Sequence, residues 1–286
     1  MWYIKNMFSR TGEFRDGIYL LNAPEVPVYL IRGKKNYLVD SAFTFMGRKI
    51  LKDLEKLEVE PHFLLLTHSH YDHVGAAPVL KKRFPHMKIV SSARTAEVLK
   101  KPRAVELIKK LEREAERVFG VRSEDEFEPF SVDVVLGEGE GLDEFFVLET
   151  PGHTRCSISF AFQEKEIIFV GDAAGVIDDG HIRPQFLSNY SQYLDSLKKI
   201  MTYSHFSLGL GHGGIFPRGK EFLEKSMERT REFREEILKL YARWGDPERV
   251  AEEIYKNEYQ KLGLRQPKEA YTINLKAMIR AVLQDS

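Results

Sequence analysis

The run HSHYDH places four residues with metal-binding side chains within six positions. They are His68, His70, Asp72 and His73. Neutral imidazole and carboxylate are the ligands that suit zinc and related divalent ions, and ligands spaced this closely on one turn can converge on two neighbouring ions. The run therefore predicts a metal site, and its spacing is compatible with a two-metal centre.

Three further residues of the same two kinds stand alone in turn sequences. His153 lies in TPGHT, Asp172 in VGDAAG and His212 in GLGHGG, and each follows a predicted strand. Taken singly, each is equally well interpreted as a hydrogen-bonded turn residue, because Gly-His and Gly-Asp pairs are common in turns. Since all three share the position of HSHYDH relative to a strand, we expect them to meet it at one edge of the fold.

The elements expected around HSHYDH alternate between strands and helices. Short apolar, β-branched runs predict strands, and a 3.6-residue periodicity predicts helices. We expect strands at 17–21, 28–31, 37–39, 63–66 and 88–91, with helices at 47–57 and 75–84. This order is typical of βαβ units in an α/β fold, and it places the run directly after a buried strand.

A strongly charged segment at 100–128 interrupts this alternation. Leu107, Leu111 and Val118 are spaced for one apolar helix face, so we interpret the segment as a helical insertion. It could cover the site as a lid, form the contact of a homodimer, or pack on the domain as a solvated helix.

The strand pattern resumes after the insertion and then gives way to helices. We expect strands at 132–136, 145–148, 158–162, 167–170 and 208–210, with a helix at 191–203. Beyond residue 217 the patterns are all helical, at 220–244, 246–256 and 269–283. The predicted organisation is a catalytic domain over 1–217 and a C-terminal helical segment over 218–286 that packs on it.

Composition limits the partners and the compartment. The 286 residues carry 43 Lys and Arg against 43 Asp and Glu, which is not the balance of a nucleic-acid or anionic-membrane binder. The single cysteine, Cys156, cannot form an intramolecular disulfide and fits a reducing compartment. No leader pattern or membrane-length apolar run is found, so we expect a cytoplasmic protein without a membrane partner.

Taken in order, the seven metal-binding residues resemble the HxHxDH, His, Asp, His pattern of the metallo-β-lactamase-fold hydrolases. The resemblance extends over about residues 15 to 217 and implies an α/β fold, the αββα sandwich, here with a C-terminal helical appendage. It implies one ion on His68, His70 and His153, a second on Asp72, His73 and His212, and Asp172 as the bridge between them. Asp40, in YLVDSA, matches the first motif of the family, whose aspartate supports the ligand loop from behind. A plain strand-ending aspartate is the alternative.

The resemblance also implies a reaction. Two neighbouring ions lower the pKa of a bridging water and so supply a metal-bridging hydroxide as the nucleophile of a hydrolase. Asp72 is the candidate catalytic residue, carrying a proton to the leaving group. Zinc is the expected ion because the ligands are imidazole and carboxylate, with iron and manganese as alternatives.

Substrate preference is inferred from which family features are present. His70 stands where the oxygen-reducing diiron branch has a glutamate, and the tyrosine that some lactone-cleaving members place soon after Asp172 is missing. We expect a small-molecule substrate, an ester, thioester or lactone. An endoribonuclease or phosphodiesterase is the second prediction, because the C-terminal helices loosely resemble that group. Their 15 Lys and Arg against 13 Asp and Glu are few for tracking phosphates. A mononuclear-iron persulfide dioxygenase is the third, and a non-catalytic binding module is the alternative outside enzymes.

Candidate substrate contacts come from apolar and basic residues near the motifs. An aromatic and apolar cluster follows Asp40, and a second follows Asp172, which together could line a pocket for an acyl or aromatic group. A basic side chain in HIRPQF could meet a substrate carboxylate or phosphate. Core packing or simple exposure is the alternative for each, and the candidates are Tyr71, Phe43, Arg183, Phe186 and Tyr190.

Overall fold

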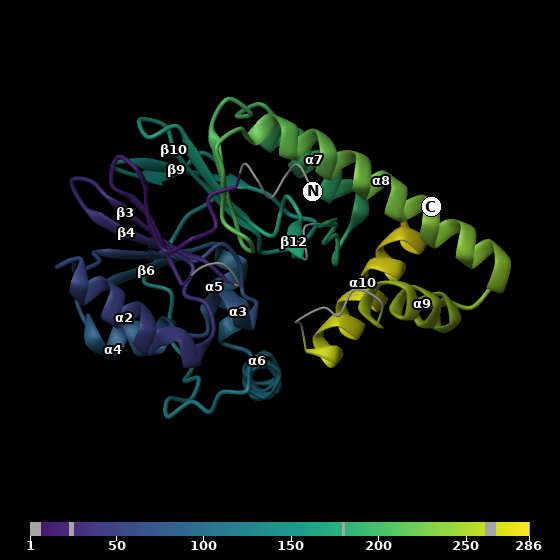
Figure 1. The fold of residues 1–286 in the computed structure, drawn as a ribbon, viewed down its shortest axis with the longest axis horizontal. Coiled ribbons are helices and arrows are strands. Elements are labelled where there is room, and N and C mark those ends of the chain that lie inside the picture. Colours follow the sequence, from purple (N-terminus) through teal and green to yellow (C-terminus); the bar gives the residue numbers. More distant parts are fainter. Residues whose placement is uncertain (1–6, 23–25, 179–180, 261–266, 286) are drawn as a thin grey trace.

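The structure, a computed structural model, describes residues 7–22, 26–178, 181–260 and 267–285. Two β-sheets pack face to face, and helices cover the outer face of each, which gives four layers in the order αββα (Figure 1). The predicted αββα sandwich is therefore confirmed.

The first sheet contains seven strands in chain order. Antiparallel pairing joins the first four, and parallel pairing joins the fourth to the seventh, because helical crossovers connect the later strands. The strands are β1 (Gly12–Arg15), β2 (Ile18–Leu21), β3 (Val28–Arg32), β4 (Asn36–Val39), β5 (Phe63–Leu65), β6 (Lys88–Ser91) and β7 (Val134–Val135). The crossovers contain η1 (Thr44–Met46), α2 (Gly47–Lys56), α3 (Tyr71–Val74), α4 (Ala77–Arg83) and α5 (Ala93–Leu99).

The second sheet has the strand order β15-β14-β11-β10-β9-β8. Its strands are β8 (Gly141–Leu142), β9 (Phe145–Glu149), β10 (Ile158–Phe162), β11 (Ile167–Gly171), β14 (Ser207–Leu210) and β15 (Ile215–Phe216). The parallel pair β11 and β14 is joined through α7 (Tyr190–Met201) and a separate hairpin of β12 (Val176–Asp178) and β13 (His181–Arg183).

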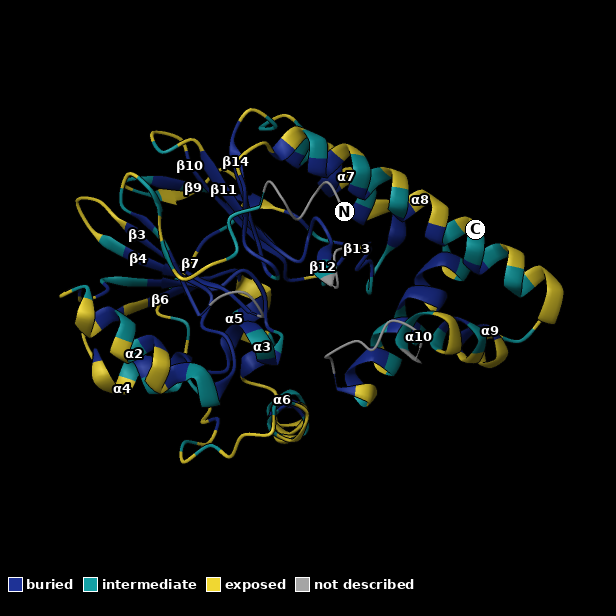
Figure 2. Ribbon diagram, in the orientation of Figure 1, coloured by how far each residue is buried: buried dark blue, intermediate teal, exposed yellow. Residues whose placement is uncertain are grey.

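The core is layered like the fold. Between the sheets lie aromatic and branched side chains that include Tyr29, Tyr37 and Phe169. A second buried cluster joins the first sheet to α2 and α4, and a third joins the second sheet to α7 and the C-terminal helices. Strands β10 and β11 are buried on both faces, which explains their continuous apolar sequences (Figure 2).

The insertion forms one long helix, α6 (Pro102–Phe119), which ends at Gly120 in the left-handed conformation. Its predicted apolar face is wrong in part: Leu111 is buried, but Leu107 and Val118 are 43% and 44% exposed. The residues that pack inward are Ile108, Leu111, Glu112 and Ala115. The helix is thus rotated relative to the predicted apolar face. Its inward face includes the carboxylate of Glu112, which is buried against Thr44, and no apolar pattern indicates such a contact.

The C-terminal segment consists of α8 (Gly219–Trp244), α9 (Pro247–Tyr255), the π-helical turn η2 (Lys256–Gln260) and α10 (Lys268–Gln284). Asp246 caps α9, since its side chain accepts the N–H of Glu248 at 3.0 Å. The segment packs on the second sheet and on α7 through a shared buried cluster, and individual side chains add further contacts. The Arg183 guanidinium lies over the Tyr271 ring at 5.0 Å, and Lys110 of α6 pairs with Glu269 of α10.

Other boundaries differ from the sequence prediction. The helix expected at 75–84 is α4, and a separate short helix that was not predicted, α3, begins inside the HSHYDH run. The short strands β1, β8, β12, β13 and β15 were not predicted, because two to four residues carry too little periodic signal. Within the described ranges, the helices are all too short or too polar to be candidates for crossing a membrane.

Candidate metal centre

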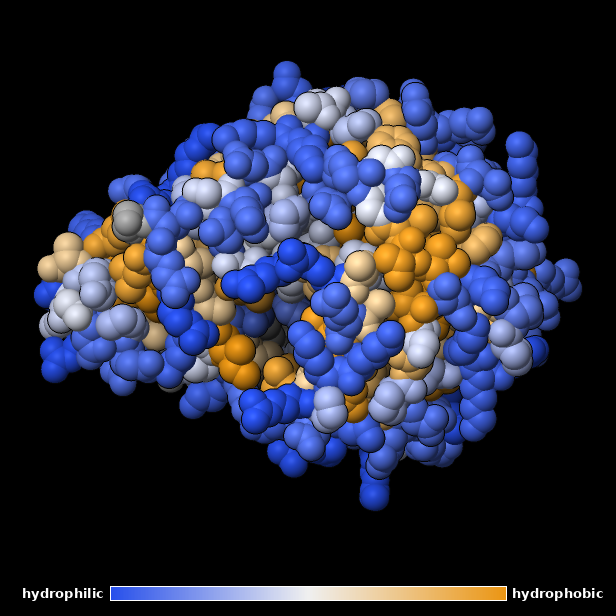
Figure 3. Space-filling model, turned by 180° about the vertical axis from the view of Figure 1, so that it is seen from behind, coloured by the Kyte–Doolittle hydropathy of each residue, from blue (hydrophilic) through white to orange (hydrophobic). Residues whose placement is uncertain are grey.

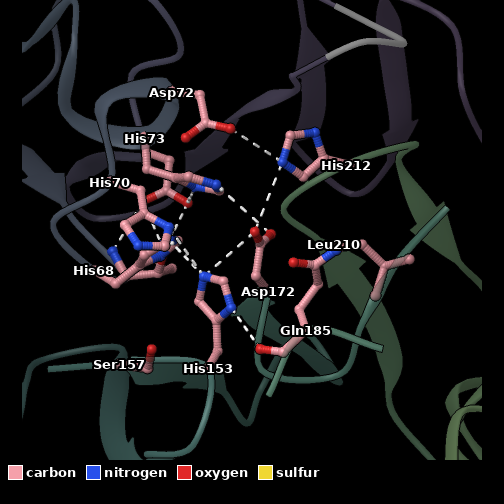
Figure 4. Close-up of polar contacts among 12 residues, drawn as sticks. His68, His70, Asp72, His73, His153, Ser157, Asp172, Gln185, Leu210 and His212 are labelled. Atoms are coloured by element: carbon pink, nitrogen blue, oxygen red, sulfur yellow. Dashed lines mark hydrogen bonds and ion pairs between the residues drawn. The ribbon is translucent and has the colours of Figure 1, made fainter. Parts of the chain in front are cut away.

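The seven predicted ligands meet at one edge of the sandwich (Figure 4). HSHYDH follows β5 and runs into α3, His153 lies in the β9–β10 loop, Asp172 follows β11, and His212 follows β14. The first sheet therefore contributes four of these side chains and the second sheet three. They converge because β5, β11 and β14 end at the same edge of the fold.

The first donor group consists of His68, His70, His153 and Asp172, whose ligand atoms all lie within 4.8 Å of one another. Nε2 of His153 is 3.2 Å from Nε2 of His68 and 3.1 Å from Nδ1 of His70. It is also 3.5 Å from Oδ2 of Asp172. Three imidazole nitrogens and one carboxylate oxygen at this spacing match the donor number and type of a tetrahedral zinc-like site.

The second donor group consists of Asp72, His73 and His212. Nε2 of His212 lies 3.3 Å from Oδ2 of Asp72. Asp172 stands between the two groups: its Oδ2 is 3.7 Å from Nε2 of His212, and its Oδ1 is 3.6 Å from Nε2 of His73. Oδ2 of Asp172 thus faces both donor groups, and Oδ1 faces the second group.

Two buried atoms in this cluster have no hydrogen-bond partner among the described residues. They are Nε2 of His73 and Oδ1 of Asp172, and they face each other beyond hydrogen-bond distance. A buried polar atom left unpaired costs free energy, about 1–3 kcal/mol. A cation held by both atoms removes that cost, so the residues present fit bound divalent ions.

Hydrogen bonds outside the donor groups fix the orientation of the imidazoles. Nδ1 of His73 is 2.8 Å from Oδ2 of Asp40, and Nδ1 of His68 is 3.0 Å from Oγ1 of Thr67. The Thr67 hydroxyl in turn donates to Oδ2 of Asp40 at 2.8 Å, and Nδ1 of His153 donates to the Gln185 carbonyl at 2.7 Å. With Nδ1 bearing the proton, Nε2 of each ring presents its lone pair to the donor group.

Asp40 accordingly lies where the resemblance places it, behind the ligand loop. Its φ of 57° is left-handed, a conformation that aspartate tolerates better than most residues. Thr67 was not predicted as a site residue, although its place as the polar end of an apolar run was visible in the sequence. Gln185 acts through its backbone carbonyl, for which no sequence signal exists.

Burial keeps the imidazoles of the first group neutral. It lowers the pKa of His68 and of His153, and together with the nearby His153 it lowers the pKa of His70 to about 3. These rings therefore offer unprotonated nitrogens at neutral pH, which is the form that binds a metal ion.

The carboxylates of the centre are held in the charged form. Burial raises the pKa of Asp72, but the facing His73 and His212 outweigh it and lower that pKa to about 2. Burial likewise opposes the change at Asp172, where His212 and His73 hold the pKa well below its usual range. For His73, burial lowers the pKa, but Asp40 and Asp172 raise it well above its usual value. The centre thus has a strong affinity for positive charge, and protons compete with metal ions for it.

The chain matches the metallo-beta-lactamase superfamily over residues 22–212. It belongs to this superfamily. Over 181 residues it is 32% identical to the hydroxyacylglutathione hydrolase GloC of Haemophilus influenzae, with 61% of this chain and 79% of that protein covered. The metallo-beta-lactamase family protein TTHA1429 of Thermus thermophilus aligns with a TM-score of 0.67 at 19% identity, covering 96% of this chain and 95% of that one. A di-iron-bound structure of TTHA1623 aligns with a TM-score of 0.52 at 23% identity, covering 75% and 96%.

The protein is thus a metal-dependent hydrolase of the metallo-β-lactamase superfamily, and the predicted resemblance is confirmed. The sequence match ends at residue 212, whereas the likeness in fold to TTHA1429 takes in nearly the whole chain. The C-terminal helices are therefore part of a fold that another metallo-β-lactamase family protein shares.

The predicted substrate contacts, unlike the predicted metal ligands, do not gather around one point, and most of them are buried in the core. Phe186 is fully buried in the core against Tyr190 and Tyr193, so in this conformation it packs the fold and offers no surface to a substrate. Phe43 is also buried, and Tyr71 packs on its ring at 5.6 Å between centroids. These aromatic residues were predicted from sequence proximity to the motifs, which does not show which face of a loop they occupy.

Two other predicted residues lie at the contact between the sandwich and the C-terminal helices. Arg183 is buried beneath Tyr271, and the Tyr190 ring lies 5.3 Å from the Arg234 guanidinium of α8. Their roles as substrate contacts stay predictions. Cys156 is buried, with its Sγ 3.1 Å from Oγ1 of Thr154.

Proposed function

We propose that the protein is a binuclear metallohydrolase for small carboxylic esters, thioesters or lactones, with thioesters as the first class to test. The observation that carries the proposal is the pair of complete donor groups that share Asp172. His68, His70 and His153 would hold one ion, Asp72, His73 and His212 would hold the other, and Asp172 would bridge them. Zinc is the proposed metal because the donors are imidazole and carboxylate, and iron is the alternative.

The chemistry of such a pair suits acyl transfer to water. When bound, two adjacent divalent ions supply an activated water at neutral pH and polarise the carbonyl oxygen of the substrate. Asp172 holds the two donor groups in register, and Asp40 holds His73 from behind. Asp72 is the one carboxylate of the second group and is partly exposed. We propose that it carries a proton to the leaving oxygen or sulfur.

Thioesters are placed first because the chain is similar to GloC of Haemophilus influenzae, a hydroxyacylglutathione hydrolase. Figure 3 shows a hollow near the centre of the molecule seen from behind, with apolar side chains gathered along parts of its rim. Hydrophilic side chains line the rest of the rim, and a mixed recess of this kind suits a small molecule with an apolar part and a polar part. A small-molecule substrate, a cytoplasmic location and a homodimer remain proposals.

The test begins with elemental analysis of protein purified without chelators. The same sample is then assayed with an acyl-glutathione thioester, an aryl ester, a lactone and a bis-aryl phosphodiester. We expect two ions per chain and turnover of at least one carboxyl substrate. The His70→Ala variant should lose an ion and its turnover, while His86→Ala, which changes a half-exposed histidine away from the cluster, should lose neither.

Three outcomes would contradict the proposal. Turnover of the phosphodiester alone would identify a nuclease-type enzyme. One iron per chain with oxygen consumption and no hydrolysis would identify the persulfide dioxygenase type. Less than one ion per chain, with no turnover after reloading, would indicate a binding module.

A further inference from the structure

The buried hydroxyl of Tyr29, a residue of the first sheet, contacts the loop of the second sheet that carries His212. Tyr29 lies on β3 of the first sheet, and its ring packs 4.7 Å from that of Phe169 in the core between the sheets. Its hydroxyl crosses to the second sheet, where it lies between the carbonyl oxygens of Leu210 and Gly214, 3.0 Å from the latter. Burial, and after it the charge on Asp40, raises the pKa of Tyr29, so the hydroxyl keeps its proton as a donor.

The two carbonyls form the neck of the loop between β14 and β15. The Leu210 N–H donates to the Gly214 carbonyl at 3.0 Å, which closes the neck, and Tyr29 meets it on the side of the first sheet. The next N–H along, that of Gly211, donates to the Gly171 carbonyl at 2.8 Å, directly before Asp172. The segment between the two carbonyls, residues 211–213, is thus held at both ends.

The backbone of this loop touches the metal centre itself. A Cβ atom on Gly211 would lie 2.2 Å from Oδ1 of Asp172 and 2.7 Å from Cε1 of His73. No side chain separates Gly211 from Asp172 and His73. A shift of the loop neck therefore moves the His212 imidazole directly relative to Asp172. Protein interiors are close-packed, and small displacements of this kind are transmitted.

His212 depends on this loop more than His73 and His153 depend on theirs. Its side chain is 22% exposed, whereas those of His73 and His153 are fully buried. Fully buried rings are confined by packing on all sides. The position of a partly exposed ring is set to a greater extent by the backbone that carries it.

We infer that Tyr29 is a positioning residue for the second donor group. Its hydroxyl fixes the neck of the 210–214 loop and so places Nε2 of His212 opposite Asp72 and Asp172. The inference rests on the proposed function only in assigning Asp72, His73 and His212 to one ion. Tyr29 makes no contact with the donor atoms, so it acts through the loop and not on the substrate.

The test uses Tyr29→Phe, which removes one oxygen and keeps the ring. The matched control is Tyr37→Phe, since Tyr37 is also buried between the sheets, on the neighbouring strand, and packs on Phe63 and Phe162 instead of the loop. Metal-free protein is titrated with Co²⁺ and with Zn²⁺ against a chelator, and the Co²⁺ absorption bands report each site. His212→Ala supplies the reference spectrum of a damaged second site.

We expect Tyr29→Phe to weaken the second ion about 10- to 100-fold, the range found when a residue that orients a ligand is lost, and to leave the first ion unchanged. Its Co²⁺ bands should change in the direction of His212→Ala. The Tyr37→Phe control should change neither affinity nor spectrum. Equal weakening of both ions in Tyr29→Phe, or no weakening, would overturn the inference.

A second measurement covers the case in which Tyr29→Phe does not fold. Amide hydrogen exchange on the metal-free parent protein should show slow exchange at Leu210 and Gly211, because Tyr29 holds the loop neck before any ion binds. Fast exchange at Leu210 and Gly211, with Leu208 and Gly209 of β14 protected, would overturn the inference. A parent protein that never takes up a second ion would instead refute the binuclear proposal, so the two failures are distinguishable.

Discussion

Replacing Asp40 by asparagine tests whether the residue behind the ligand loop sets the affinity of the second ion. Its carboxylate accepts the Thr67 N–H at 2.8 Å through Oδ1, and Oδ2 receives the Thr67 hydroxyl and faces Nδ1 of His73, each at 2.8 Å. Asparagine keeps the shape and one acceptor oxygen. If that oxygen stays on the Thr67 N–H, the amide NH₂ faces the protonated Nδ1 of His73, and two donors oppose each other.

The magnitude follows from the lost interaction. A hydrogen bond to a charged group contributes about 1.5–3 kcal/mol. Transmitted to the ion through His73, this corresponds to a loss of affinity of about 10- to 100-fold, because each 1.4 kcal/mol is a factor of ten. With metal in excess, the loaded protein loses the same free energy of unfolding. At about 2–4 °C per kcal/mol, its Tm should fall by roughly 3 to 12 °C.

The assay is metal titration against a chelator, followed by thermal unfolding with and without metal. The control is Asp133→Asn, because Asp133 also accepts a backbone N–H at 2.8 Å, from Ile89, and pairs with Lys81, but lies outside both donor groups. It should leave both affinities unchanged. If Asp40→Asn binds the second ion as tightly as the parent protein does, Asp40 does not orient His73, and the reasoning is refuted.

Three further predictions follow from individual contacts. Asp72→Asn should lower kcat by about 10²- to 10⁴-fold, since it removes the proposed proton carrier; full turnover with both ions bound would exclude that role. Burial raises the pKa of Glu112 to about 8 despite its hydrogen bonds from Thr44, so its contribution to stability is complete below its unfolded pKa near 4.5 and is lost as the pH rises towards 8. Between pH 5 and pH 8, the free energy of unfolding of Glu112→Gln should therefore rise by up to a few kcal/mol relative to that of the parent protein. The Tm of both proteins is measured at the two pH values, and a constant difference in Tm would contradict the prediction. Lys110→Ala, at the exposed pair with Glu269, should leave the midpoint of denaturant unfolding almost unchanged, because exposed ion pairs contribute little to stability, and a clear loss would show that α6 and α10 depend on this contact.

The ligand positions were predictable because each depends on a local pattern. HSHYDH follows a continuous apolar run, which marks a buried strand, and the three isolated residues follow runs of the same kind. Chemistry in such folds gathers where strands end, so residue type and position together indicated the cluster. The alternation of strands with helices likewise indicated the layers, but not the shortest strands.

Features that depend on contacts distant in sequence were not predictable. The orientation of α6 is set by the burial of Glu112 against Thr44, a pair 68 residues apart. Phe186 follows the bridging aspartate in sequence but points into the core. Tyr29 has the sequence signature of an ordinary strand residue, because its partners are backbone carbonyls 181 and 185 positions away.

The two donor groups differ in how firmly the fold holds them, and this difference bears on their roles. In the first group, His68 and His153 are fully buried, and their Nδ1 atoms are engaged by Thr67 and Gln185. In the second group, the side chains of Asp72 and His212 are 14% and 22% exposed. His70 of the first group is partly exposed as well, so the centre opens to solvent where His70, Asp72 and His212 lie. The leaving group would depart on that side, where Asp72 can donate a proton to it. The more deeply buried first group would stay fixed, and Asp172, which faces both groups, would position the second group relative to it.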